Sequence, residues 1–331
     1  MSISDHLKLR YSGVALVVLL GVAAMAISQK YSGPVMLFAI LIGLSLHPAY
    51  ESVKLQAGID WCARPLLLIG VALLGFRVDF HDFVALGFIS PLIAISCLVL
   101  TILFGIVFSQ LIGISSRLSI LISGAVAICG VSAAVAISSA LPKSESQDRD
   151  LALTVAGVTA MSTLAMIVYP VISEWLNHST VQAGLFLGSS IHDVAQVVGA
   201  GYSISDDAGN NATLVKLIRV SALLPVVLII SLIYRKQKQQ ISRQQSVSLL
   251  PPFLIAYIII AALNSFHIFP NAIQNLGIEA SKYCLIISLV AIGLKTDLRS
   301  ISTVGRAPLA LLISATIMLA LTSLALIHFF V

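Results

Sequence analysis

Long apolar runs recur along the whole chain and constrain its fold more than any other feature. A helix of about 20 apolar residues crosses the roughly 30 Å hydrocarbon core of a bilayer. A membrane β-barrel would alternate apolar and polar residues, which these runs do not do. The sequence therefore predicts an all-α polytopic membrane protein with about eleven transmembrane segments, at 11–28, 33–48, 63–77, 84–110, 119–140, 150–173, 183–202, 213–234, 250–268, 280–297 and 306–330.

Composition and charge agree with a membrane protein. Of the 331 residues, 58% are hydrophobic and 10% charged, whereas a soluble domain has about 25% charged residues. The net charge of +5 lies mostly in connections between segments, where Lys and Arg set orientation, so it does not indicate nucleic acid. Alternate connections carry twelve and seven basic residues, with twelve on the side of the N-terminus. This bias predicts a cytoplasmic N-terminus and a periplasmic C-terminus.

The chain is expected to divide into three parts. Residues 1–32 form a cytoplasmic N-terminus and a first segment that is retained as a signal anchor. Segment two contains LIGLSLHPA (41–49) and segment seven contains FLGSSIHDV (186–194), which share Gly, Ser and His at the same spacing. Two further matches follow in the same order. The sequence therefore predicts two inverted five-helix repeats, as in many secondary transporters, at 33–173 and 183–331, with a polar cytoplasmic connection at 235–248.

Segments five and ten are the predicted discontinuous helices. Segment five holds Cys129-Gly130 in mid-run, and a break there would leave a half-helix starting at Gly130, Val131 and Ser132 with free N–H groups for an anion. The alternative is close helix packing through small residues. The residues expected to bind substrate are Cys129, Gly130, Val131 and Ser132 in segment five, Arg219 in segment eight, and Gly293, Lys295 and Thr296 at the end of segment ten.

Two of these assignments leave alternatives open. Lys295 either reaches the crossing of the broken helices or extends to the membrane surface at an ordinary helix end. Arg219 either pairs with Asp193 or binds an oxyanion through its planar fork of donors.

Segment seven carries His192, Asp193 and Gln196, which share one broad face of a helix. Ionisable groups deep in a membrane are costly, so they indicate a functional site. His192 and Asp193 are expected to bind a coupling proton, or Asp193 a sodium ion, together with Gln196. The alternative places His192 and Asp193 in water at the interface.

Motifs that would indicate an enzyme or a pump are missing. HDxxQ resembles the zinc-protease motif HExxH but has Gln196 in place of the second His and Asp193 in place of the Glu. The four cysteines contain no CxxC pair, and no G-x-x-x-x-G-K-[ST] loop occurs. We expect neither an enzyme nor an ATP-driven pump, and no metal or cofactor beyond a coupling proton or sodium ion.

Five strings of this sequence resemble the YeiH-type family of bacterial inner-membrane proteins, which are often described as sulfate exporters. They are GFR (75–77), ICG (128–130), SSIHDVAQVVGAG (189–201), NATLVKLIRV (211–220) and GLKTDL (293–298). The resemblance covers nearly all of the chain after the first segment. It implies kinship with cation/proton antiporters and bile-acid sodium symporters, which have inverted five-helix repeats and two crossing discontinuous helices. The family often has Glu at the position of Asp193, and its polar residues near Lys295 vary.

The resulting prediction is a secondary active transporter in the bacterial inner membrane. The substrate class is a small anion, with a sulfur oxyanion such as sulfate or sulfite favoured, exported by alternating access. The resemblance also allows a sodium- or proton-coupled symporter of an organic acid. A membrane enzyme or sensor is the non-transport alternative. Related transporters often dimerise, so a homodimer is expected.

Overall fold

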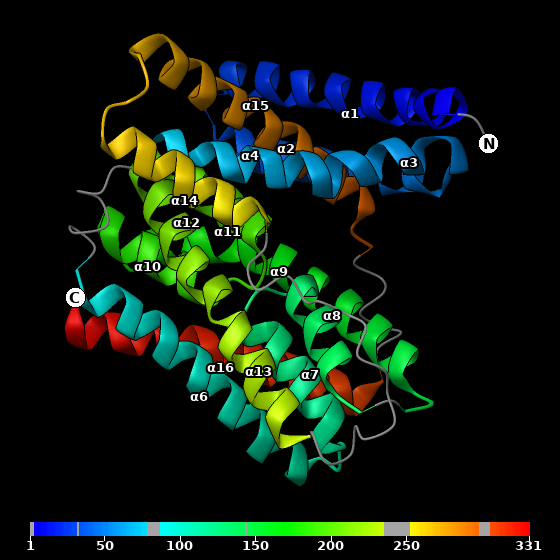
Figure 1. Cartoon of the computed structure of the whole chain (residues 1–331), viewed down its shortest axis with the longest axis vertical. Helices are drawn as coiled ribbons and strands as arrows, with labels where there is room; N and C mark the ends of the chain where they lie inside the picture. Colours follow the sequence, from blue (N-terminus) through cyan, green and yellow to red (C-terminus); the bar gives the residue numbers. More distant parts are fainter. Residues whose placement is uncertain (1–2, 32, 78–86, 143, 235–251, 298–304) are drawn as a thin grey trace. The chain divides into compact units, whose positions relative to one another are not determined.

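The computed structural model describes residues 3–31, 33–77, 87–142, 144–234, 252–297 and 305–331 (Figure 1). Regular structure in these residues is helical throughout. The chain forms two compact units, each made of segments that are distant in sequence. Unit 1 comprises 1–85, 198–210 and 252–297, and unit 2 comprises 86–197, 211–251 and 298–331. Each unit draws on both predicted repeats, and the internal symmetry of the chain stays a prediction.

Unit 1 is built on long helices that cross at glycines. It contains α1 (Ile3–Tyr31), α2 (Val35–Ser45), α3 (Val53–Trp61), α4 (Leu67–Leu73), α14 (Pro252–Ser265) and α15 (Asn271–Lys295). A π-helical turn at Cys62–Leu66 joins α3 to α4; Pro65 lies in it, and a proline has no N–H to continue the ordinary ladder. Helix α1 packs on α3, and α2 packs on α15.

The contact between α2 and α15 explains one predicted site residue. A Cβ atom on Gly293 would lie 2.5 Å from the Ile40 carbonyl oxygen and 2.8 Å from Gly43 Cα. Only glycines allow two helices to approach this closely. The predicted break of segment ten at Gly293 is wrong, because α15 runs without interruption from Asn271 to Lys295. Gly293 is a packing residue there.

Unit 2 contains the interrupted helices. It comprises α6 (Ile89–Leu111), α7 (Ser116–Ala127), α8 (Val131–Ala140), α9 (Gln147–Trp175), α10 (Thr180–Ser190), α13 (Leu223–Ile233) and α16 (Arg306–Phe330). Helix α11 (Val194–Ile204) begins in unit 2, and α12 (Asp206–Ser221) ends in it. The starts of α7 and α10 follow from sequence, because Ser115 accepts from the Leu118 N–H and Ser179 forms a capping box with Gln182.

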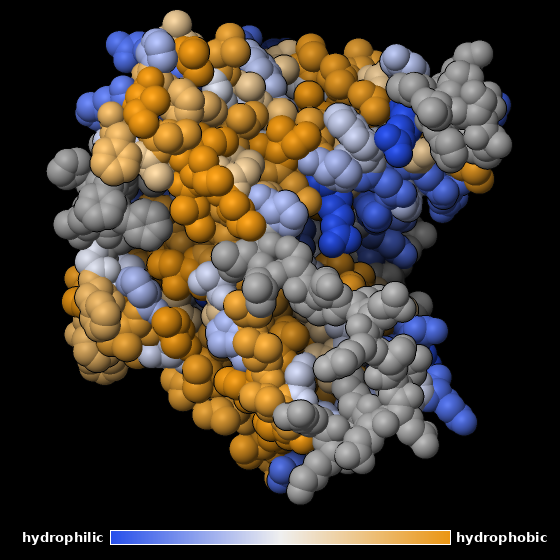
Figure 2. Space-filling model, in the orientation of Figure 1, coloured by the Kyte–Doolittle hydropathy of each residue, from blue (hydrophilic) through white to orange (hydrophobic). Residues whose placement is uncertain are grey.

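The helices fit a bilayer by length and composition. Among the described residues, seven helical stretches are long and apolar enough to span a membrane: Arg10–Tyr31, Val53–Arg77, Ile89–Leu111, Gln147–Trp175, Asp206–Ile233, Asn271–Lys295 and Arg306–Phe330. Shorter apolar helices make up the second, fifth and ninth predicted segments and part of the seventh. Apolar side chains cover much of the visible surface (Figure 2), and exposed ones such as Leu19 and Val107 are those expected to face lipid.

Candidate functional site

The break predicted in segment five is confirmed. Helix α7 ends at Ala127 and α8 begins at Val131. Between them Gly130 adopts φ 63° and ψ −122°, a conformation that residues with a Cβ atom rarely take. Ile128 and Cys129 are buried, and the Ser132 hydroxyl donates to the Cys129 carbonyl oxygen at 3.1 Å. The glycine in mid-run therefore marks a true interruption, with half-helices on either side.

The second interruption lies in segment seven, which we predicted as a continuous span. Helix α10 ends at Ser190 and α11 begins at Val194, with Ile191 in extended backbone. The Asp193 carbonyl oxygen accepts the first helical hydrogen bond of α11, from the Val197 N–H at 3.1 Å. The Asp193 N–H donates to Ser162 Oγ on α9 at 3.1 Å. The polar string His192-Asp193 is thus the unwound part of a broken helix.

The two interruptions meet inside unit 2. A Cβ atom placed on Gly130 would lie 3.4 Å from Asp193 Oδ2. The half-helices α8 and α11 therefore begin beside one another, with the Asp193 carboxylate at their N-terminal ends. The first N–H groups of a helix have no partner within it and carry partial positive charge. This junction, formed by 128–133 and 191–196, is the candidate site.

Arg219 on α12 binds the C-terminal ends of α7 and α10, the half-helices that precede the two breaks. It is fully buried, and its five N–H groups make hydrogen bonds of 2.6–3.1 Å to carbonyl oxygens. These carbonyls belong to Val126 and Ala127 at the end of α7 and to Gly188 and Ile191 at the end of α10. Every donor of the guanidinium is engaged. Arg219 thus supplies positive charge to the junction, and it has no free fork of donors for an oxyanion.

Lys216 lies one turn before Arg219 on α12 and makes three hydrogen bonds to carbonyl oxygens at the same two breaks. Its ammonium donates to the carbonyls of Ile128, Ile191 and His192 at 2.5–2.8 Å, and the side chain is fully buried. An ammonium has three N–H donors, whereas a neutral amine has two. Three acceptors therefore match the charged form. Lys216 is not among the predicted site residues, although its place on the same helical face as Arg219 in an apolar segment is a signal that the sequence offers.

His192 and Gln196 lie deep in unit 2 and not in water. Their exposed fractions are 0% and 2%, while Asp193 is half-buried. The Thr316 hydroxyl donates its hydrogen to the Leu312 carbonyl oxygen at 2.8 Å, so it accepts from His192 Nε2 at 2.9 Å. His192 Nε2 therefore carries a hydrogen. Of the predicted trio, Asp193 lies against Gly130, and the His192 carbonyl shares Lys216 with that of Ile128.

The remaining predicted residues belong to unit 1. Lys295 is half-exposed and forms an ion pair with Asp60 at 2.7 Å. The Tyr50 hydroxyl also donates to Asp60, at 3.0 Å; burial, with the charge of Asp60, raises the pKa of Tyr50 to about 12. The Thr296 hydroxyl donates to the Ile292 carbonyl oxygen. Lys295 and Thr296 thus have structural partners at the end of α15, as Gly293 does within it.

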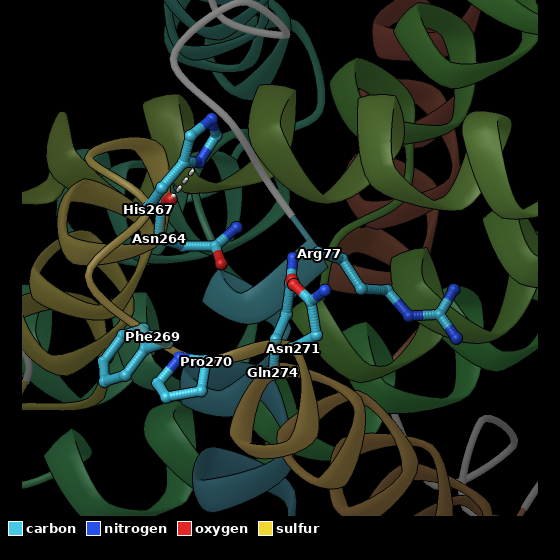
Figure 3. Close-up of a pocket in the computed structure, with 7 residues that line it drawn as sticks. All are labelled: Arg77, Asn264, His267, Phe269, Pro270, Asn271 and Gln274. Carbon is cyan, nitrogen blue, oxygen red and sulfur yellow. Dashed lines mark hydrogen bonds between the residues drawn. The ribbon is translucent and has the colours of Figure 1, made fainter.

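Unit 1 also holds a cavity of about 620 Å³ where α14 ends and α15 begins (Figure 3). Its polar lining comes mainly from amide side chains and His267, whose ring contacts the Asn264 carbonyl oxygen. In Figure 3 the Arg77 guanidinium points away from these amides; it forms an ion pair with Asp206 at 2.9 Å. The lining residues are Arg77, Asn264, His267, Phe269, Pro270, Asn271 and Gln274.

Comparison with known proteins extends the resemblance drawn from the sequence. A family model described as conserved hypothetical protein 698 matches residues 12–312. A UPF0324 membrane protein of Rhizobium meliloti is 43% identical over 98% of this chain and 94% of its own length. The UPF0324 membrane protein TauZ of Paracoccus denitrificans is 43% identical over 94% of this chain and 92% of its own.

A more distant relative carries the name that the sequence motifs suggest. The UPF0324 inner membrane protein YeiH of Escherichia coli is 30% identical over 82% of this chain and 78% of its own length. No solved structure matches the chain. With its apolar helices, the chain is a multi-pass protein of the inner membrane, and it belongs to the UPF0324 family of membrane proteins.

Proposed function

We propose that the chain is a secondary transporter of a small anion, bound at the junction of the two interrupted helices. The observation that carries this proposal is the meeting of two half-helix N-termini, α8 and α11, beside Gly130 and Asp193. Each N-terminus presents N–H donors and a partial charge of about +0.5. Together they offer about one unit of positive charge and several donors to an anion. Interrupted helices with this role are a recurrent device of secondary transporters.

Fixed charges add to the attraction. Lys216 and Arg219 contribute two positive charges, and an ionised Asp193 removes one, so the junction has a formal charge of +1. In a low-dielectric interior such charges act strongly at short range. A monoanion balances the junction when Asp193 is ionised. A dianion such as sulfate balances it when Asp193 carries a proton, so one proton would accompany each dianion.

Asp193 is accordingly the proposed coupling group, with His192 and Gln196 lining the same turn. An ionised carboxylate beside the N-termini of α8 and α11 competes with an incoming anion for the same N–H groups. Protonation removes that competition. This accounts for an ionisable side chain at a buried helix break, where it is otherwise costly.

The resemblance to the YeiH-type family favours a sulfur oxyanion such as sulfate or sulfite, export as the direction, and homodimerisation. The inverted repeats are inferred from the Gly, Ser and His that segments two and seven share at the same spacing. The cytoplasmic N-terminus and periplasmic C-terminus rest on the distribution of Lys and Arg. Alternating access would carry the junction in unit 2 from one side of the membrane to the other.

Anion flux in proteoliposomes tests the proposal. Purified protein is reconstituted, and uptake of sulfate, sulfite and small carboxylates is measured with and without pH and sodium gradients. We expect oxyanion uptake that a pH gradient drives. Asp193→Asn mimics the protonated carboxyl, so it should keep anion exchange but lose accumulation driven by the pH gradient.

The matched control is Asp148→Asn, an exposed carboxylate at the start of α9, which should behave as wild type. Absence of flux for every anion would refute transport. Flux of oxyanions with an unchanged pH response in Asp193→Asn would refute the coupling role. Preference for organic carboxylates would replace the oxyanion as substrate.

A further inference from the structure

Backbone carbonyls exposed by a broken helix are places where cations bind. The last carbonyls of a helix lack partners within it and carry partial negative charge. In many transporters such unwound carbonyls coordinate the coupling ion, and rings of carbonyls replace the hydration shell of potassium in channels. The junction of unit 2 holds carbonyls of this kind from both interrupted helices.

Lys216 occupies the centre of this carbonyl group. Its Nζ atom lies 2.8 Å from the Ile128 oxygen on the first break, and 2.8 Å and 2.5 Å from the oxygens of Ile191 and His192 on the second. The ammonium is therefore a cation held by three carbonyl oxygens. The side chain comes from a third element, α12, so neither broken helix supplies it.

Two cations face these negative helix ends. The C-terminal ends of α7 and α10 each carry about −0.5 of a unit charge, and both Lys216 and Arg219 donate to carbonyl oxygens there. Arg219 takes the carbonyls of Val126, Ala127 and Gly188 and shares that of Ile191, so the remaining oxygens are left to Lys216 alone.

We propose that Lys216 is a resident cation in what would otherwise be an alkali-metal site, and that this chain consequently needs no sodium or potassium ion. The three carbonyl oxygens form the site, and the ammonium is its permanent occupant. Loss of the lysine side chain opens the site to a monovalent metal ion. The consequence for ion coupling rests on the proposed transport function, whereas the cation site itself does not.

Thermal unfolding in detergent tests the site without measuring transport. Wild type and Lys216→Ala are unfolded in equal concentrations of sodium, potassium or choline chloride, because choline is too large for a site of ammonium size. The wild type should unfold at one temperature in all three salts. Lys216→Ala should unfold at a lower temperature in choline and regain about 5 °C in saturating sodium or potassium. Lys54→Ala, which removes an exposed lysine of α3, should respond to none.

Lys216→Gln provides a second variant if the alanine variant does not fold, since its amide keeps two N–H donors but no charge. It should show a smaller stabilisation by sodium or potassium. A wild type that is stabilised specifically by an alkali ion would overturn the proposal. So would variants that respond to sodium, potassium and choline alike.

Flux measurements then separate this inference from the proposed function. Wild-type anion flux that is equal in sodium and choline supports a cation site that Lys216 fills permanently. Flux that requires sodium overturns it and leaves anion transport standing. If no anion is transported, the salt dependence of unfolding still decides whether Lys216 fills a cation site.

Discussion

Replacing Arg219 with alanine should destabilise unit 2 by an amount that follows from its contacts. The change removes five hydrogen bonds of 2.6–3.1 Å. The Ile191 carbonyl keeps its hydrogen bond from Lys216, but the carbonyls of Val126, Ala127 and Gly188 lose the hydrogen bonds that Arg219 donates. Each buried acceptor left without a partner costs about 1–3 kcal/mol. We therefore expect a loss of at least about 3 kcal/mol.

The loss can be measured with a thiol-reactive dye during heating. Cys62, Cys97 and Cys129 are buried, so the dye reports their exposure on unfolding. At about 2 °C per kcal/mol for a large domain, Arg219→Ala should unfold at least about 6 °C below wild type. Arg219→Lys keeps the charge with fewer donors and should fall between the two. Arg306→Ala, which removes an exposed arginine of α16, should change the temperature by less than about 2 °C. A similarly small change in Arg219→Ala would refute the argument, because its carbonyls would then find other partners at no cost.

Three further substitutions separate structural from functional roles. Gly130→Ala should lower the free energy of unfolding by about 1–3 kcal/mol because of the positive φ of 63°, and it should abolish anion flux. The control Gly113→Ala, at φ 70° with open space at the Cβ position, should lose a similar free energy and keep the flux. Flux retained in both variants would exclude the junction as the site. Gly293→Ala should lower the unfolding temperature by several degrees, since its Cβ atom would lie 2.5 Å from a carbonyl oxygen of α2, and an unfolding temperature equal to that of wild type would contradict the close packing. Lys295→Ala should lower the free energy of unfolding by less than about 1 kcal/mol, because the ion pair with Asp60 is about half exposed. It should leave anion flux within twofold of wild type, and loss of flux would restore Lys295 as a substrate ligand.

Residue types and periodicity predicted the helical membrane class, and each of the eleven predicted segments corresponds to one or more helices. The break at Gly130 was predictable because a glycine in mid-segment permits a positive φ. The break at His192-Asp193 was missed because no glycine marks it; its signal was the cost of ionisable groups in a continuous apolar helix. Gly293 gave the opposite error, because close helix crossing and helix interruption both select glycine, and only the packing partner on α2 distinguishes them.

The role of Lys216 lay beyond local reasoning for a different reason. Its carbonyl partners are 88, 25 and 24 residues away in sequence. A lysine in an apolar segment indicates that some acceptor lies nearby, but its identity depends on how three separate elements pack. The same holds for Arg219, whose partners are 28–93 residues away.

The anchoring of both breaks on α12 limits how the junction can move. Lys216 and Arg219 lie one turn apart on a single helix, and both donate to the Ile191 carbonyl oxygen. A displacement of α7 against α10 would stretch contacts to both side chains at once. Within unit 2, the C-terminal ends of α7 and α10 and the part of α12 that carries Lys216 and Arg219 should therefore move together. If the junction binds an anion as proposed, a conformational change would then leave the geometry of the binding site unchanged.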